Sequence, residues 1–591
     1  MFNPVHLKVG TKAIAKCLVL LLVFAAFIVP TMPVRGQGNS EETPANFRRR
    51  PDRVPGEYIV VFKDEVPKDE VVPLANELAR VHRGTVLFIY EDVLKGFAVR
   101  LPETSAVAIS HNPLVDNVTE NYEFSLTTTQ SNATWNLNRI DQRGAVDPFS
   151  TTHQYNYGNT GSGVNVYVVD TGIYRSHTQF GGRAAAAFDA VDDDNNPATP
   201  TDTDNPAGDR GQDCNGHGTH VAGIIGGATY GVAKSVNLYS VRVVGCNGTF
   251  GTELLAGLNW LISNHIKPAV ANMSLEVFPA DPNVDQAVRN LIARGVLCVV
   301  GAGNGTGRDQ VERDVADVSP ARVAEAITVS ATDRSDTRPG YANFGAGVDV
   351  FAPGGGAVFG NPNVSILSAY PFPDVNNTNV YDPNATYSLY GTSMATPHVT
   401  GVAAMYLQSN RYDSPYSVSQ RILDNSTKGV VQNAGAGSRP DMIYSNFNMS
   451  PQAPSWSVPF YRYYSPGVTD HFFTTNFNEL GFGSLGYNFY WRECSIFSQQ
   501  QSGSVALYRY YNSTTGDHFY TTDYNELGAG AQGYAYEWIQ GYVYPSPQAG
   551  TVPLYRFWNA TVGDHLYTIN LNDLDLNQGY VYEKVQCYVY P

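Results

Sequence analysis

Positive charge is scarce in this chain of 591 residues. Lys and Arg together number 38 against 54 Asp and Glu, which gives a formal net charge of −16 and a pI of about 5.2. A protein that binds nucleic acid needs a basic stripe to neutralise phosphates, and the sequence shows none. The composition therefore argues against a nucleic-acid partner and suits a soluble extracellular protein.

Long hydrophobic runs are missing beyond the N-terminus. The apolar run there, Cys17–Val29, follows three lysines and is followed by small residues at Val34–Gly36. It is shorter than the roughly 20 residues that span a bilayer comfortably. The pattern is typical of a secretory signal peptide, residues 1–36. We therefore expect secretion and no membrane contact.

Cysteine is rare as well, with six in the chain, and Cys17 is lost with the signal peptide. An oxidising destination favours disulfides among the other five. Cys298 lies in an apolar strand, Gly295–Val300, and is expected to be a buried thiol. Cys494 and Cys587 are a possible disulfide pair.

The length and the order of motifs predict three folded units, at about 150 residues per domain as a first guide. Residues 50–128 alternate strand and helix patterns and predict a small α+β unit, with an amphipathic helix over Val71–Arg80. Residues 131–448 alternate apolar strands with helical stretches, which predicts a doubly wound, mostly parallel α/β sheet.

The third unit, residues 456–591, contains three copies of one sequence. Asp-His pairs begin at Asp470, Asp517 and Asp564, each 47 residues after the last, and a Tyr-Arg pair precedes each of them. Three copies with short aromatic strands predict an all-β module, with a β-trefoil as the specific guess. We expect the Asp-His pairs to be structural; the aromatic side chains leave a glycan or surface ligand open.

Candidate catalytic residues occur in the middle unit in the order Asp, His, Ser. Asp170 ends the apolar run Val164–Val169, His217 begins a glycine-rich helical segment, and Ser393 precedes another apolar run. A carboxylate at a strand end can orient an imidazole, and a serine at a helix N-terminus benefits from the helix dipole. These contexts fit a serine nucleophile, its base and the group that orients the base.

At this point the chain resembles the subtilisin-like serine proteases, most closely the proteinase K branch and its aqualysin-type relatives. The resemblance rests on segments in family order, namely Trp135–Asp141, Val168–Gly172, Asp213–His220, Val241–Val243, Gly303–Asn304 and Gly391–Pro397. It implies a secreted serine endopeptidase with Asp170, His217 and Ser393 as the triad and Asn304 in the oxyanion hole. His217, and not His220, occupies the family's motif position.

The resemblance carries further expectations. Residues 50–128 are similar to inhibitor propeptides, which implies a zymogen whose propeptide inhibits the enzyme until self-cleavage near Ser125–Gln130. Cys214 and Cys246 correspond to a family disulfide. Asp349 corresponds to the carboxylate of a structural Ca²⁺ site, whose other protein ligands would be main-chain oxygens, here of Ala324 and Ala326.

One departure from the family affects the substrate. Relatives have Ser-Leu-Gly-Gly where this chain has Ser274-Leu275-Glu276-Val277, and that segment pairs with the peptide as an added strand. Glu276 could clash with a substrate or attract a basic side chain, so the side-chain preference stays open. One alternative is a glycan- or surface-binding protein with an inactive protease domain. Another is an esterase, although Ser393 lacks a Gly-x-Ser-x-Gly elbow.

Overall fold

The computed structural model describes residues 46–49, 53–122, 128–147, 150, 152–191, 211–246, 251–305, 311–375, 380–449, 454 and 456–591. The expected signal peptide and part of the expected cleavage segment lie outside these residues. Over the described ranges, no helix combines the length and the apolar character needed to cross a membrane.

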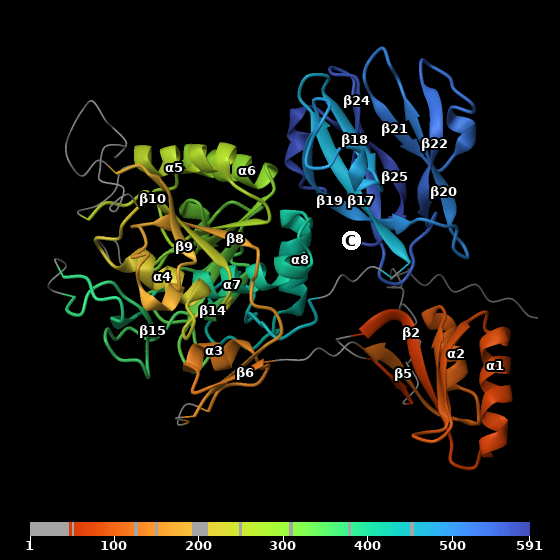
Figure 1. Cartoon of the computed structure of the whole chain (residues 1–591), viewed down its shortest axis with the longest axis horizontal. Coiled ribbons are helices and arrows are strands. Elements are labelled where there is room, and N and C mark those ends of the chain that lie inside the picture. The colour runs from red at the N-terminus through yellow and green to blue at the C-terminus, as the bar shows by residue number, and fades with distance from the viewer. Residues whose placement is uncertain are drawn as a thin grey trace, which may run out of the picture. The chain divides into compact units, whose positions relative to one another are not determined.

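The N-terminal α+β unit is a five-stranded sheet with two helices (Figure 1). Its elements are β1 (Phe47–Arg48), β2 (Arg53–Phe62), α1 (Val71–Val81), β3 (Thr85–Tyr90), β4 (Gly96–Arg100), α2 (Glu103–Ser110) and β5 (Val115–Tyr122). The strand order is β1-β5-β2-β4-β3. Helix α1 buries Val71, Ala75, Leu78 and Ala79, which recur on one helical face as an amphipathic helix requires.

The middle unit is built on a seven-stranded parallel sheet with the strand order β14-β13-β12-β11-β8-β10-β9. Its strands are β8 (Asn165–Asp170), β9 (Ala184–Asp189), β10 (Asn237–Arg242), β11 (Ala269–Met273), β12 (Val296–Gly301), β13 (Ile327–Thr332) and β14 (Val350–Pro353). Every residue of β8, β11 and β12 is buried, as expected for a parallel sheet covered on both faces. The predicted α/β class is confirmed.

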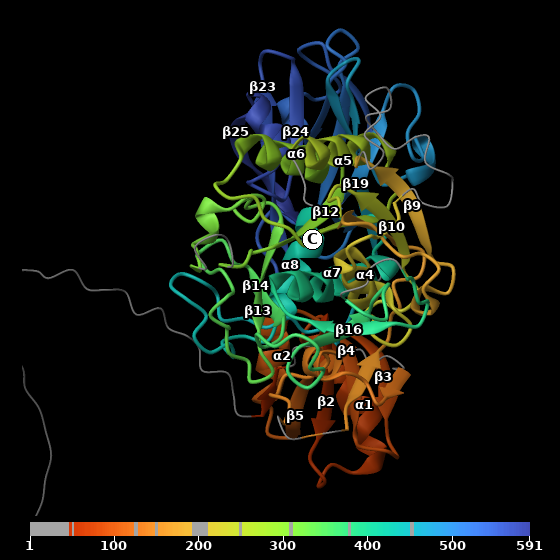
Figure 2. The same ribbon diagram turned by 90° about the vertical axis from the view of Figure 1, so that its left-hand side faces the viewer.

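Helices cover both faces of this sheet (Figures 1 and 2). One face packs on α3 (Trp135–Ile140), α4 (His217–Gly226), α7 (Thr392–Ser409) and α8 (Pro415–Asn425). The other face packs on α5 (Gly251–Asn264) and α6 (Pro282–Ala293). Two further antiparallel pairs join β6 (Thr128–Ser131) to β7 (Gln154–Tyr157) and β15 (Ile366–Ala369) to β16 (Thr386–Leu389).

The strand order reverses at β8, which has β11 on one side and β10 on the other. In open parallel sheets, ligands bind outside the carboxyl ends of the strands at such a switch point. Asp170 is the last residue of β8, Ser274 directly follows β11, and Asn304 lies three residues after β12. The fold therefore brings these three chain positions to one edge of the sheet.

The repeat module is all-β, and each copy forms three antiparallel strands with the first strand in the middle. The strands are β17 (Ser457–Ser465), β18 (Asp470–Thr474), β19 (Asn488–Phe497), β20 (Val505–Tyr511), β21 (His518–Thr521), β22 (Ala535–Val543), β23 (Val552–Asn559), β24 (Asp564–Thr568) and β25 (Val581–Val589). Pairing of β19 with β22 joins the first two copies into one six-stranded sheet. The β-trefoil itself remains a prediction.

The cysteines fall into two groups. Cys214 and Cys246 form the expected disulfide, with 5.5 Å between their Cα atoms. Cys298, Cys494 and Cys587 are free and buried. Cys494 and Cys587 both lie in the hydrophobic core of the repeat module as free thiols, and the possible second bridge between them is not formed.

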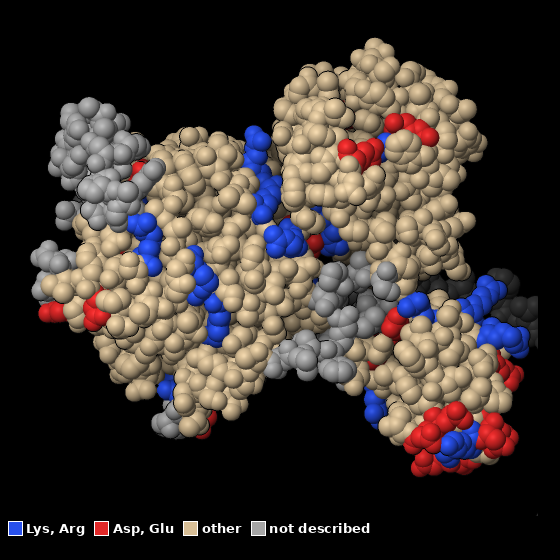
Figure 3. Space-filling model, in the orientation of Figure 1, with Lys and Arg blue, Asp and Glu red and all other residues tan. Residues whose placement is uncertain are grey.

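Charged side chains are unevenly spread over the face shown in Figure 3. The α/β domain and the repeat module are mostly uncharged on this face, whereas the N-terminal unit carries a patch in which both signs are mixed. Lys68 and Asp92 of that unit form an ion pair of 2.5 Å between two exposed side chains. Such exposed pairs contribute little to stability.

Candidate active site

Asp170 and His217 are hydrogen bonded at the carboxyl edge of the parallel sheet. Oδ1 of Asp170 accepts from His217 Nδ1 at 2.7 Å and from the Thr171 amide at 2.7 Å. The Asp170 side chain is 2% exposed, whereas that of His217 is 28% exposed. The carboxylate is therefore shielded from water, while the imidazole can be reached from outside.

The charge of Asp170 sets the protonation of His217. Burial by itself would lower the pKa of His217, but the Asp170 carboxylate and its hydrogen bond outweigh burial, so the pKa is raised above its ordinary value. A bond to Nδ1 also fixes the tautomer in which Nε2 of the neutral ring is a proton acceptor. The pair therefore has the electrostatics of a general base.

Helix α4 begins at His217, and its second residue lies so close to the segment after β8 that only glycine fits there. A Cβ on Gly218 would lie 2.1 Å from the carbonyl oxygen of Gly172. Gly216, the residue before the helix, has φ +102°, in the left-handed region that favours glycine. These two glycines let the start of α4 lie directly against the end of β8.

Asp213 holds the same turn and was not among the predicted site residues. Its Oδ1 accepts from the amides of Asn215 and Gly216 at 3.0 and 2.8 Å, and its Oδ2 accepts from the amide of Thr219 at 2.8 Å. Asp213 is fully buried. It satisfies amides at the start of α4, a role that an Asp shortly before a helix start could have signalled.

Ser393 is the second residue of α7, as a serine before an apolar run suggested. Its Oγ donates to the carbonyl oxygen of Ser274 at 3.2 Å, and the Ser274 hydroxyl donates to the carbonyl oxygen of Ser393 at 2.9 Å. Within the described ranges, no hydrogen bond joins Ser393 to His217. In enzymes generally, a contact between a nucleophile and its base is often long without substrate and tightens when substrate binds.

Asn304 contacts the residue before Ser393. Its Oδ1 accepts from the Thr392 amide at 3.0 Å and from the Thr392 hydroxyl at 3.2 Å. Because the oxygen of the side-chain amide is engaged, its Nδ2 is the group that can donate to a substrate oxygen. Residue Asn304 as a whole is partly exposed.

Glu276 reaches the same place from the loop after β11. Its Oε2 accepts from the main-chain amide of Asn304 at 2.8 Å. The sequence identified Glu276 as a departure from the family, but gave no indication of which way the side chain turns. The structure directs it toward Asn304.

Asp349, the predicted Ca²⁺ ligand, lines a cavity together with Ala324 and Ala326. Its Oδ2 accepts from the Thr328 amide at 2.9 Å. Burial raises the pKa of Asp349 to about 6. A carboxylate that shares a cavity with main-chain segments offers the hard oxygen ligands that Ca²⁺ prefers, so the chemistry of these residues is compatible with the ion.

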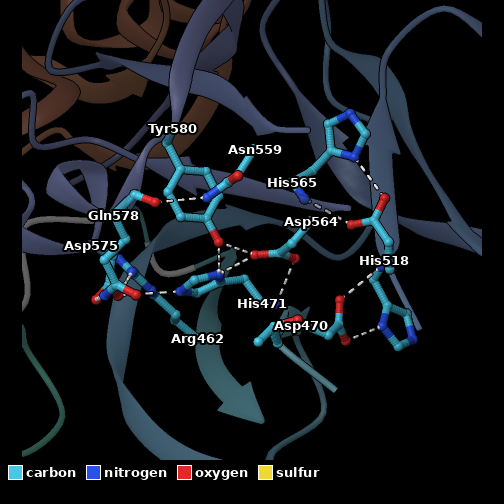
Figure 4. Close-up of polar contacts among 12 residues, drawn as sticks. Arg462, Asp470, His471, His518, Asn559, Asp564, His565, Asp575, Gln578 and Tyr580 are labelled. Atoms are coloured by element: carbon cyan, nitrogen blue, oxygen red, sulfur yellow. Dashed lines mark hydrogen bonds and ion pairs between the residues drawn. The ribbon is translucent and has the colours of Figure 1, made fainter. Parts of the chain in front are cut away.

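A second set of Asp–His contacts lies in the repeat module (Figure 4). Asp470 accepts from His518 Nδ1, Asp517 from His565 Nδ1 and Asp564 from His471 Nδ1, each at 2.6 Å. Each carboxylate also accepts the main-chain amide of the same histidine. Every Asp therefore binds the histidine of the following copy, and the third binds that of the first.

This arrangement is a closed ring, which we call the Asp–His ring. Its carboxylates are at most 1% exposed, and each also accepts a tyrosine hydroxyl of its own copy, from Tyr487, Tyr534 or Tyr580. One oxygen from each of the three Asp residues lies within 4.8 Å of the others. Because histidine and tyrosine donors engage these carboxylates, the ring is explained by hydrogen bonding alone.

The arginines of the repeated Tyr-Arg motif form a second cycle. Arg509 binds Glu479 of the first copy at 3.1 Å, and Arg556 binds Glu526 of the second copy at 2.9 Å. Arg462 binds Asp573 of the third copy at 2.5 Å. Both cycles link the last copy to the first.

Comparison with protein families separates the chain into the same three regions. The model described as peptidase inhibitor I9 matches residues 57–127, and that of the subtilase family matches residues 161–441. Residues 448–590 match a domain of unknown function, DUF5648.

Relatives with similar sequences are named as serine proteases. The chain is 40% identical over 428 residues to an extracellular serine proteinase of Thermus sp. (strain Rt41A), covering 69% of this chain and 94% of that protein. It is 34% identical to alkaline serine exoprotease A of Vibrio alginolyticus, covering 73% of this chain and 77% of that protein. A crystal structure of a cold adapted subtilisin-like serine proteinase matches 53% of this chain and 98% of its own, with 38% identity and a TM-score of 0.44.

Proposed function

The chain belongs to the subtilase family, and from this premise we propose that it is a secreted serine endopeptidase, made as a precursor that its own propeptide inhibits. The observation that carries the proposal is the 2.7 Å bond between buried Asp170 and accessible His217. The proposed nucleophile is Ser393, at the N-terminal end of α7. The helix dipole there favours the negative charge that develops during attack.

Peptide cleavage would begin with attack of Ser393 Oγ on the scissile carbonyl carbon. His217 Nε2 accepts the hydroxyl proton, and Asp170 stabilises the imidazolium that forms. The negative charge moves to the carbonyl oxygen. Asn304 Nδ2 and the Ser393 amide would donate to it, and loss of one such donor typically costs about 3 kcal/mol of transition-state stabilisation.

The second half of the reaction reuses the same groups. The tetrahedral intermediate collapses, the bond to the leaving nitrogen breaks, and His217 returns its proton to that nitrogen. Water then attacks the acyl-Ser393 ester while His217 again accepts a proton. The second product leaves as a free carboxylate, and Ser393 regains its hydroxyl hydrogen.

The N-terminal unit would be the inhibitor that is removed by self-cleavage near Ser125–Gln130. Its support is the match of residues 57–127 to the inhibitor I9 model. A large parallel sheet has many contacts between distant residues and folds slowly, so an attached template is useful before it is removed. The expected result of Ser393→Ala is a secreted chain that retains this unit.

Calcium would be held by Asp349 with main-chain oxygens of Ala324 and Ala326. When bound, the ion would supply structural stabilisation and take no part in the reaction. We expect a chelator to lower the melting temperature of the wild type, and Asp349→Asn to abolish that chelator effect. Equal melting temperatures with and without chelator would exclude the ion.

The test of the proposed activity uses three precursors: wild type, Ser393→Ala, and Ser409→Ala as a control at the other end of α7. Wild type and Ser409→Ala should be processed and should hydrolyse casein, with inhibition by a serine-reactive phosphonate. Ser393→Ala should do neither. A folded wild type without casein hydrolysis would instead favour a glycan- or surface-binding protein, and turnover of esters without peptides would favour an esterase.

A further inference from the structure

Two loops flank Ser393, and one side chain connects them. The loop after β11 contacts Ser393 through Ser274, with hydroxyl-to-carbonyl bonds of 2.9 and 3.2 Å. The loop after β12 contacts Thr392 through Asn304, at 3.0 Å. Glu276 of the first loop crosses to the second, where its carboxylate accepts from the Asn304 amide at 2.8 Å.

The Glu276 carboxylate lies directly against the main chain of the second loop. A Cβ on Gly303 would be 2.0 Å from Glu276 Oε2, so the carboxylate occupies the space that a side chain at position 303 would need. Gly303 has φ +91°, which also favours glycine. The negative charge is therefore held against the main chain of Asn304, the proposed oxyanion donor.

The surroundings of this carboxylate are mixed. Residue Glu276 as a whole is exposed, although its carboxyl group is partly enclosed. Burial raises the pKa of Glu276, and the Asn304 amide and the Arg313 charge act in the opposite direction. The Arg313 guanidinium lies over the Phe278 ring at 4.0 Å.

We propose that Glu276 is a specificity-determining residue that favours lysine or arginine at the substrate residue whose carbonyl is attacked. This inference rests on the proposed endopeptidase function. The carbonyl must lie between Ser393 Oγ and Asn304, so the side chain on the adjacent Cα starts between the same two loops. A long cationic side chain can extend along the loops to the Glu276 carboxylate.

The physical reason is charge balance in the transition state. With no substrate cation beside it, the Glu276 carboxylate near the oxyanion site opposes the negative charge that develops on the substrate oxygen. A substrate ammonium or guanidinium group neutralises the carboxylate and removes this opposition. Glu276 thus gives cationic substrates a higher kcat/KM than neutral ones. It takes no proton in the reaction, so its role is to select and position the substrate.

The experiment compares two peptides that differ only in lysine or norleucine at the attacked position. Norleucine has the aliphatic chain of lysine without its ammonium group. The proteins are mature wild type, Glu276→Gln, Glu276→Gly, and Asp317→Asn as a control that removes one charge from an exposed turn nearby. Gln keeps an acceptor for the Asn304 amide, so this variant isolates the charge.

We expect wild type and Asp317→Asn to cleave the lysine peptide about 10-fold more efficiently than the norleucine peptide, and Glu276→Gln to bring that ratio close to one. Glu276→Gly should lose the preference and also lower kcat for both peptides, because Asn304 loses a contact. Added salt should reduce the wild-type ratio, since the pair is partly solvated.

Two results would overturn the inference: a wild-type ratio at or below one, or an undiminished ratio in Glu276→Gln. If a Glu276 variant does not fold, the salt dependence of the wild-type ratio decides, and a ratio independent of salt counts against the ion pair. Failure of the endopeptidase proposal is distinguishable, because wild type would then cleave neither peptide nor casein.

Discussion

The same two residue types serve different purposes in two regions of this molecule. In the α/β domain, Asp170 makes one contact with His217, whose side chain remains 28% exposed. In the repeat module, each Asp of the Asp–His ring binds both the amide and the Nδ1 of a histidine whose side chain is at most 10% exposed. An Asp–His pair becomes chemically useful only when the far nitrogen of the imidazole can be reached.

The carboxylates of the two regions also differ in the hydrogen bonds that they make besides those to histidine. Within the described ranges, Oδ2 of Asp170 has no hydrogen-bond partner although it is buried. Each ring carboxylate receives a tyrosine hydroxyl in addition to its histidine. A fully engaged carboxylate stabilises a fold, whereas an incompletely engaged one is free to strengthen its bond to an imidazolium as charge develops.

The largest expected effect is on activity. Asp170→Asn should lower kcat about 10⁴-fold, because an amide favours the wrong imidazole tautomer. Self-processing of the precursor, followed on gels, and casein hydrolysis measure the loss. The free energy of unfolding should change far less than activity. Retained processing would show that the pair in the α/β domain is as structural as the pairs in the ring.

The matching change in the ring should have the opposite pattern. Asp517→Asn leaves His565 without its carboxylate and should destabilise the repeat module by about 3–5 kcal/mol, as loss of one partner of a buried pair does. Urea unfolding measures the change, and hydrolysis of a short peptide should be preserved. Loss of peptidase activity in the folded variant would contradict a purely structural ring.

The two regions should also respond to pH in opposite directions: activity should fall as the pH is lowered, and the stability of the repeat module should fall as the pH is raised. The raised pKa of His217 means that activity falls about 10-fold per unit of pH once the pH is below that pKa, which lies above the ordinary value near 6.5. Burial alone would lower the pKa of His471, but Asp564 and Asp575 raise it to about 9. The stabilisation that protonated His471 contributes is fully present below the pKa of this histidine in the unfolded chain.

That contribution, on the order of 3 kcal/mol, should be lost as the pH rises through about 9. The measurements are a kcat/KM profile for the active site and urea unfolding at several pH values for the module. A module whose stability does not change between pH 6 and 10 would refute the paired, protonated state of His471.

The smallest expected effect tests the tyrosine contacts. Tyr534→Phe removes the hydroxyl that binds Asp517 and should cost about 1–2 kcal/mol of unfolding free energy, since two bonds from His565 remain. Tyr524→Phe is the control, because Tyr524 is 40% exposed in the same copy. Equal effects of the two changes would mean that the hydroxyl adds nothing to the ring.

Local sequence patterns predicted much of the α/β domain. Apolar strands alternating with helices gave the class of sheet, and Asp170 and Ser393 do lie at a strand end and a helix start. These features depend on residues close together in the chain. The disulfide between Cys214 and Cys246 followed from family resemblance and is present.

Contacts that depend on tertiary register could not be predicted. A period of 47 residues revealed three Asp-His pairs, but an Asp and the next His in sequence do not bind each other. Which copy each carboxylate reaches is fixed by strand packing. The direction of Glu276 and the turn held by Asp213 likewise depend on loops that meet only in the folded chain.

Closure of the Asp–His ring has a consequence for how the repeat module should withstand proteolysis. Asp564 is hydrogen bonded to His471, so the third copy is joined to the first by a side-chain contact as well as by the covalent backbone. Cleavage of one peptide bond in a surface turn would therefore leave two fragments that stay associated through these contacts. The same cleavage in an open row of repeats would let the fragments separate.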